Sequence, residues 1–131
     1  MDIFRYLVGY DNVNRVKEAL KNGADINAKN KSNFTALHIA VVNGQYFLAR
    51  MLILHDVNLN EVDDTGYTPL HWAIHLDNLE ITKLLMDSCA ENLKTTEGSP
   101  YSIIKDKNNV IKKYIDNTYN SGKNDNMPYN V

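Results

Sequence analysis

Apolar residues recur at intervals of three and four along two short segments of the chain, about residues 46–54 and 79–87. The residues that carry this spacing are Phe47, Met51 and Leu54 in the first segment and Ile81, Leu84 and Leu85 in the second. Such spacing places the apolar side chains on one face of an α-helix. Helices of this length are unstable alone in water, so we expect neighbouring helices to bury these faces.

A six-residue phrase occurs twice in the chain, 33 residues apart. It reads Thr-Ala-Leu-His-Ile-Ala from Thr35 and Thr-Pro-Leu-His-Trp-Ala from Thr68. A threonine that precedes a helix accepts a hydrogen bond from a free backbone N–H of the first turn. Proline, as at Pro69, suits the first helical position. We therefore predict helices over about 36–42 and 69–75, each followed by a tight turn and then by one of the two segments above.

The same period relates most of the remaining chain. The aligned stretches are Gly23–Asn27 with Asp56–Asn60, and Asp11–Val13 with Gly44–Tyr46 and then with Asp77–Leu79. Extended backward, the phrase falls on Asp2–Leu7, and extended forward it falls near Ser99–Ile104. A fixed period of roughly 20–50 residues is typical of stacked repeats. We interpret the chain as four such units, of which the first is degenerate and the last is shortened.

The repeated phrase, the period of 33 and the run Gly-Ala-Asp-Ile-Asn-Ala from Gly23 to Ala28 resemble the ankyrin repeat family. The resemblance implies an all-α solenoid in which each unit is a pair of antiparallel helices followed by a projecting β-hairpin finger. It covers residues 1–116, in units of about 1–33, 34–66, 67–97 and 98–116, with fingers near 28–34, 61–67 and 94–98. Residues 117–131 are polar, and we expect a flexible tail.

The chain departs from the ankyrin pattern where that pattern places glycine after the second helix. Gly23 fits the pattern, but Asp56 and Cys89 take the glycine position in the next two units. Asn33 similarly replaces the finger glycine that occurs at Gly66. A left-handed backbone conformation at a residue with a side chain costs about 1 kcal/mol or more. We therefore expect Asp56 to be strained, and Asn33 to tolerate its turn better than most residues would.

Composition indicates a single domain without a basic surface. The chain has 131 residues and a net charge of −2, which argues against non-specific binding of nucleic acid. It contains no apolar run long enough to span a membrane, and its one cysteine suits a reducing, cytoplasmic compartment. Abundant Asn, Lys, Ile, Asp and Tyr are consistent with an AT-rich genome, such as those of many intracellular bacteria and some large DNA viruses.

The sequence offers no catalytic, metal or cofactor motif. In ankyrin repeats the histidine of the phrase, here His38 and His71, hydrogen-bonds the backbone between neighbouring units, and no zinc-ligand spacing accompanies either. Cys89 is best interpreted as a small buried hydrophobe. The pair Asp63 and Asp64 lies in a finger, where aspartates stabilise turns. We expect no enzyme activity, no metal and no cofactor.

By resemblance, a partner protein would contact the finger tips and the ends of the first helices, on the concave side of the stack. The candidate residues are Tyr10, Lys31, Ser32, Phe34, Val42, Asn43, Asp64, Thr65, Tyr67, His75 and Leu76. Phe34 and Tyr67 have the aromatic character of interface anchors, but they could instead pack between neighbouring fingers and stiffen them. Trp72 is expected to pack rather than to recognise a partner.

Two classes of function remain open at this point. The first is a monomeric, non-enzymatic adaptor that binds another protein through the concave groove, with a host protein as the partner if the source is an intracellular organism. In that case the protein would be secreted into the host cytosol. The second is a structural or self-associating ankyrin unit with no dedicated partner.

Overall fold

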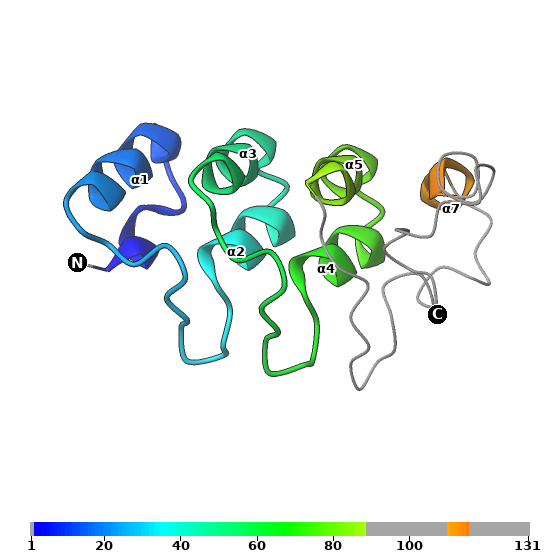
Figure 1. Cartoon of the computed structure of the whole chain (residues 1–131), viewed down its shortest axis with the longest axis horizontal. Helices are drawn as coiled ribbons and strands as arrows, with labels where there is room; N and C mark the ends of the chain where they lie inside the picture. Colours follow the sequence, from blue (N-terminus) through cyan, green and yellow to red (C-terminus); the bar gives the residue numbers. More distant parts are fainter. Residues whose placement is uncertain (1, 89–109, 116–131) are drawn as a thin grey trace.

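The computed structural model describes residues 2–88 and 110–115, and it shows helix pairs stacked side by side in a row (Figure 1). The elements are the 3-10 helix η1 (Ile3–Tyr6) and the α-helices α1 (Asn12–Lys21), α2 (Ala36–Val42), α3 (Tyr46–Leu54), α4 (Pro69–His75), α5 (Leu79–Asp87) and α7 (Val110–Ile115). One row contains η1, α2 and α4, and the other contains α1, α3, α5 and α7 (Figure 1). We call these the inner row and the outer row. The all-helical repeat architecture is confirmed.

The helices of the repeated phrase begin as the sequence predicts. The Thr35 hydroxyl accepts a hydrogen bond from the His38 backbone N–H at 3.3 Å, and His38 Nδ1 accepts one from the Thr35 N–H at 3.2 Å. Thr68 and His71 repeat the arrangement with the same distances. This reciprocal pair satisfies two N–H groups that a helix start leaves free. The predicted bounds 36–42, 46–54, 69–75 and 79–87 all coincide with helices of the structure.

The expectation that Phe47 and Leu54 lie in the core is wrong. Both side chains are 70% exposed, whereas α3 buries Leu48, Ala49, Met51 and Leu52. The helix is apolar on nearly every side, so its periodicity does not identify the buried face. The residues one period away from Phe47 and Leu54 are polar: Asn14, Lys21, Glu80 and Asp87. These polar residues in the equivalent positions of α1 and α5 are the signal in the sequence that the side of α3 with Phe47 and Leu54 is exposed.

In α5 the expected apolar face is largely confirmed. Ile81 and Leu85 are fully buried, and Leu84 is partly buried. The first unit is degenerate, as expected. It replaces the first helix of a unit with the single turn η1, which begins when the Asp2 carboxylate accepts the Phe4 N–H at 3.0 Å. The core is continuous along the row, from Ile3 in the first unit to Ile111 in α7.

Left-handed turns recur with the period of the repeat. Asp56, with φ 61°, occupies the position of Gly23, with φ 100°, and Asn33, with φ 60°, matches Gly66, with φ 83°. Both left-handed residues were predicted, and Cys89 lies outside the described residues. The turn between the two helices of each unit forms a third set of left-handed residues, which was not predicted from the sequence. Its members are Asp11, Gly44 and Asp77.

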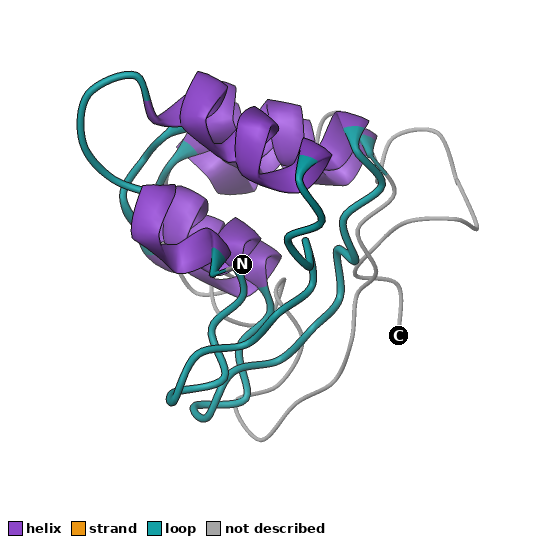
Figure 2. Cartoon of the chain, turned by 90° about the vertical axis from the view of Figure 1, so that its left-hand side faces the viewer, coloured by secondary structure: helices purple, strands orange, loops and turns teal. Residues whose placement is uncertain are grey.

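The projecting fingers are tight loops rather than strand ladders. In residues 2–88 and 110–115 no strand is present, so the hairpin expectation is not confirmed for the first two fingers. Two backbone hydrogen bonds close each finger. In the first, the Asn30 N–H donates to the Phe34 carbonyl and the Asn33 N–H donates to the Asn30 carbonyl, both at 2.9 Å. In the second, the Asp63 N–H donates to the Tyr67 carbonyl and the Gly66 N–H donates to the Asp63 carbonyl, both at 3.0 Å. The two fingers project together below the helices (Figure 2). The expected finger at 94–98 and the tail at 117–131 fall outside the described residues.

Candidate functional site

The candidate partner surface consists of the two described fingers and the C-terminal ends of η1, α2 and α4. We call it the finger face. Its exposed members are Tyr10, Lys31, Ser32, Val42, Asn43, Asp64, Thr65, His75 and Leu76. Tyr10 is 95% exposed, and Leu76 is 46% exposed. Tyr10, Asn43 and Leu76 are related by the 33-residue period, so they occupy equivalent places in three successive units.

Phe34 and Tyr67 differ from the other candidates because they are only partly exposed. The Phe34 ring packs edge-on to Trp72 in the next unit, with 6.2 Å between ring centroids. The Tyr67 ring stacks on His71 at 5.1 Å and meets Trp72 edge-on, also at 5.1 Å. His75 adds a further edge contact to Trp72 at 5.8 Å. The rings therefore form a cluster at the base of the fingers. The rings of Phe34 and Tyr67 pack on residues of α4, whereas the alternative drawn from the sequence placed them between neighbouring fingers.

Asp63 fixes the geometry of this ring cluster. Its carboxylate accepts hydrogen bonds from the Trp72 indole N–H at 2.6 Å, the Thr65 backbone N–H at 2.8 Å and the Tyr67 backbone N–H at 3.1 Å. Burial alone would raise the pKa of Asp63, but these donors and the Thr65 hydroxyl outweigh burial and lower the pKa. The carboxylate is therefore ionised at neutral pH. It holds Trp72 in one orientation, which sequence reasoning did not foresee.

His38 joins two successive units. Its Nδ1 accepts the Thr35 N–H, so the other ring nitrogen, Nε2, carries the proton and donates to the Tyr67 carbonyl at 2.9 Å. Burial lowers the pKa of His38, although the Tyr67 carbonyl and the Asp63 carboxylate, 3.9 Å away, act in the opposite direction. The imidazole is therefore neutral. The predicted hydrogen bond from this histidine to the backbone of the next unit is confirmed.

The fingers are also tied directly to each other. The Asp64 N–H donates to the Ser32 carbonyl at 3.1 Å, and the Asn33 amide donates to the Asp64 carboxylate at 2.6 Å. Closer to the helices, Lys29 pairs with Glu61 at 2.8 Å. These contacts connect residues that lie about one period apart in the sequence. The exposed side chains of the two fingers are consequently held on a fixed framework.

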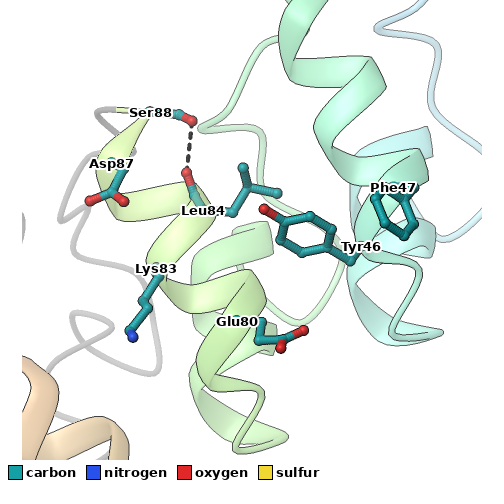
Figure 3. Close-up of a pocket in the computed structure, with 7 residues that line it drawn as sticks. All are labelled: Tyr46, Phe47, Glu80, Lys83, Leu84, Asp87 and Ser88. Carbon is teal, nitrogen blue, oxygen red and sulfur yellow. Dashed lines mark hydrogen bonds between the residues drawn. The ribbon is translucent and has the colours of Figure 1, made fainter.

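Two grooves lie on the outer row, away from the finger face. One is lined by Tyr46 and Phe47 of α3 and by residues of α5, including Glu80, Lys83 and Leu84 (Figure 3). The other lies between α1 and α3, and Phe47 contributes to both. Sequence reasoning missed these grooves because it assigned Phe47 to the core.

The described residues show no arrangement suited to metal chemistry. Within 2–88 and 110–115, no three side chains of His, Cys, Asp or Glu gather in a group that could hold a metal ion. The two histidines of the phrase are instead committed to helix starts through Thr35 and Thr68. In the same part of the chain, no helix combines the length and the apolar character needed to cross a bilayer.

Comparison with known proteins agrees with the architecture. The family model for ankyrin repeats, in three copies, matches residues 3–96. A protein of Borreliella burgdorferi named for its ankyrin repeats is 34% identical over 90 residues, which cover 69% of this chain and 40% of that protein. An ankyrin repeat protein of Acanthamoeba polyphaga mimivirus is 33% identical over 116 residues, covering 85% of this chain and 15% of the viral protein.

A third relative, an ankyrin repeat protein of Fowlpox virus, is 34% identical over 89 residues, which cover 68% of this chain and 21% of that protein. The chain therefore corresponds to less than half the length of each of these relatives. The similarity extends over the repeats.

Proposed function

This chain belongs to the ankyrin repeat family, and from that premise we propose that it binds a partner protein through its finger face without catalysing a reaction. Ankyrin repeats generally mediate protein–protein interaction. More specifically, we propose that the partner contacts the exposed residues of the two fingers and the ends of η1, α2 and α4. The exposed residues with the aromatic or apolar character that interface anchors have are Tyr10, Val42, His75 and Leu76.

The observation that carries this proposal is the rigid framework beneath those exposed side chains. Across the units, Asp63 is hydrogen-bonded to the Trp72 indole, His38 is hydrogen-bonded to the Tyr67 carbonyl, and Lys29 forms a salt bridge with Glu61. A binding surface that is ordered before the partner arrives loses less conformational entropy on binding. The exposed finger residues stand on this framework, and Tyr10, Asn43 and Leu76 recur beside it at the interval of the repeat. This spacing suits recognition of an extended surface on another protein.

The test uses substitutions that leave the framework intact. Tyr10→Ala and Leu76→Ala remove exposed side chains, whereas Phe34→Ala and Tyr67→Ala would also disturb the ring cluster. The full chain and the Tyr10→Ala/Leu76→Ala variant are used to recover partners from the native cell, and recovered proteins are identified by mass spectrometry. We expect the double variant to lose the partner and a Lys21→Ala variant, altered on the exposed end of α1, to retain it.

Two results would contradict the proposal that the partner binds at the finger face. One is unchanged recovery of a specific partner by the folded double variant, which would place binding elsewhere on the molecule. The other is equal loss of the partner in the Lys21→Ala variant, which would show no preference for the finger face. Circular dichroism of each variant confirms that the helices are retained.

The proposal extends to the class of partner and the place of action. Two of the relatives reported above are viral proteins, from mimivirus and Fowlpox virus. This is in keeping with the hypothesis, drawn from composition, of a protein that acts on a host protein in the host cytosol. Expression of a tagged chain in a candidate host cell, followed by fractionation and partner recovery, tests it. Recovery only from the producing organism's own cytoplasm would contradict the host-directed part alone.

A further inference from the structure

An outward stripe of α3 combines two exposed apolar side chains with a cation. Phe47 and Leu54 are each 70% exposed, and Arg50 lies between them on the same side of the helix, because positions i, i+3 and i+7 share one face. The helical rise places Phe47 and Leu54 about 10 Å apart along the axis. Exposed apolar side chains that share one surface and are bordered by polar residues are a feature of protein interaction sites.

The groove between α1 and α3 lies beside this stripe. Besides Phe47, Arg50 and Leu54, its lining includes Val13 and Lys17 of α1. Lys17 and Arg50 are equivalent positions of successive units, 33 residues apart. Neither forms an ion pair within residues 2–88 and 110–115, and no Asp or Glu lines the groove. The groove therefore presents apolar surface at Phe47 and Leu54 and positive charge between them.

The neighbouring groove between α3 and α5 lacks this character. Its lining mixes the acidic side chains Glu80 and Asp87 with Lys83. The Lys83 ammonium group lies over the Tyr114 ring of α7, 4.9 Å from the ring centroid. Figure 3 shows Tyr46 extending toward Leu84 of α5, whereas Phe47 leaves α3 on the other side. This second groove is the more spacious of the two, but its charges do not favour a partner of one sign.

We propose that the groove between α1 and α3 binds an acidic amphipathic segment of a partner protein. Two large apolar side chains of that segment, about one heptad apart, contact Phe47 and Leu54, and carboxylates between them contact Lys17 and Arg50. The argument is charge complementarity: Lys17 and Arg50, which have no carboxylate partner within the described residues, line the groove together with the exposed apolar side chains of Phe47 and Leu54. This surface belongs to the outer row and is separate from the finger face.

Two other occupants fit the surface less well. A second copy related by a two-fold axis through the middle of α3 would bring Arg50 against its own counterpart, because such an interface is self-complementary. A flat anionic bilayer would approach the whole outer row. Glu80 and Asp87 occupy on α5 the places of Phe47 and Leu54, so acidic side chains would meet the anionic headgroups. A narrow acidic segment confined to the groove avoids both repulsions.

The test measures binding of a fluorescein-labelled helical peptide by fluorescence anisotropy, with the full chain. The probe carries two leucines one heptad apart with two glutamates between them, and the control peptide has lysines in place of the glutamates. We expect the glutamate peptide to bind at least about tenfold more tightly than the lysine peptide, and Phe47→Ser or Arg50→Glu to weaken its binding about tenfold. The Arg50→Glu variant should bind the lysine peptide better than the wild-type chain does.

Matched controls separate this surface from the finger face and from loss of fold. The Tyr10→Ala/Leu76→Ala variant should bind the glutamate peptide as the wild-type chain does, whatever its effect on other partners. Because Phe47 and Arg50 are exposed, their substitution should leave the helical circular dichroism unchanged. Added salt should weaken binding, since the charges meet near the protein surface.

Several outcomes would overturn the proposal. These are equal binding of the two peptides, unchanged binding by a folded Phe47→Ser variant, and no binding of the glutamate peptide at millimolar protein. A dimer detected by sedimentation and abolished by Phe47→Ser would assign the surface to a second copy. Binding to phosphatidylserine vesicles that depends on Phe47 and Arg50, without peptide binding, would assign it to a membrane.

Discussion

At the scale of single residues, two buried side chains make hydrogen bonds between neighbouring units. His38 donates to the Tyr67 carbonyl of the next unit, and Asp63 accepts from the Trp72 indole. Asn30 occupies in the first finger the place that Asp63 has in the second, and it accepts the Ser32 and Phe34 N–H groups at 2.9 and 3.0 Å. The Asn30 amide can close the finger turn, but only the Asp63 carboxylate brings a full charge to it.

The neutral state of His38 gives the fold a dependence on pH. Because burial lowers the pKa of His38 in the folded protein, the unfolded chain binds the proton more readily. Its contribution to stability is therefore complete above the ordinary histidine pKa of about 6.5. It declines as pH falls below that value and is lost below the folded pKa. Protonation also removes Nδ1 as the acceptor for the Thr35 N–H.

We expect the melting temperature to fall as pH is lowered from neutral toward 5, and His38→Gln to flatten that dependence. The charged groups that face His38 are Asp63, Lys29 and Glu61. The His38→Gln variant keeps all three, so it differs from the wild-type chain only in the titrating imidazole. His75→Gln alters an exposed histidine and serves as the matched control. An equally steep pH dependence in the His38→Gln variant would contradict the assignment.

Asp56 offers a second prediction at the residue scale. Its φ of 61° lies in the left-handed region, which favours glycine. Asp56→Gly should therefore stabilise the fold by a fraction of 1 kcal/mol up to about 1 kcal/mol, measured by urea or thermal unfolding. The reverse change is Gly23→Ala, where an added Cβ would meet nothing within 4 Å, so any loss of stability reports backbone strain rather than a steric clash. A less stable Asp56→Gly variant would show that strain is not the dominant effect at this turn.

At the scale of elements, α3 shows how position in the stack determines which face of a helix is buried. α3 lies between α1 and α5 in the outer row and packs on α2 of the inner row. Contacts on these sides bury Leu48, Ala49, Met51 and Leu52 and leave the opposite stripe in solvent. Two leucines of the same helix therefore differ in solvent exposure: Leu52 is 0% exposed and Leu54 is 70% exposed.

This pair gives a direct test of the helix orientation. Leu52→Ala should destabilise the fold by about 2–5 kcal/mol, because it removes buried apolar contacts and leaves a cavity. Leu54→Ala should change stability by less than about 0.5 kcal/mol, as expected for a surface position. The measurement is the free energy of unfolding in urea for both variants. Similar losses from both would mean that α3 is rotated relative to its neighbours.

At the scale of the whole molecule, the units depend on one another because none buries its own apolar faces. The core runs without interruption from η1 through the stacked pairs to α7. Each helix has fewer than four turns, too short for independent stability in water. Interfaces between neighbouring units therefore provide much of the stability in such a stack.

Trp72 makes this coupling measurable. It is the single tryptophan of the chain and lies in α4, whereas circular dichroism reports all the helices. We expect the fluorescence and circular dichroism transitions to coincide in urea. We also expect Leu7→Ala, a buried change in the first unit, to lower both midpoints together. A fluorescence midpoint that stays fixed while the circular dichroism midpoint falls would show that the units unfold independently.

The sequence by itself determined the period, the helix bounds and most of the turns. The bounds of α2, α3, α4 and α5 follow from threonine caps, Pro69 and apolar spacing, all of which act between residues a few positions apart. The left-handed turns at Asp56 and Asn33 follow from their alignment with glycines of other units. Short-range interactions of this kind recur from unit to unit, so the repeats provide several examples of the same local pattern within one sequence.

Only the tertiary structure decided how Asp63 holds Trp72 between successive units and, within the described residues, which groove carries cations without an ion-pair partner. These features depend on side chains that the fold brings together from separate segments, such as Lys17 and Arg50, which are 33 positions apart. The residues of an apolar helix such as α3 do not by themselves indicate which side of the helix its neighbours will cover. Its exposed face is set when α1 and α5 pack on either side, because burial is a property of the assembled stack.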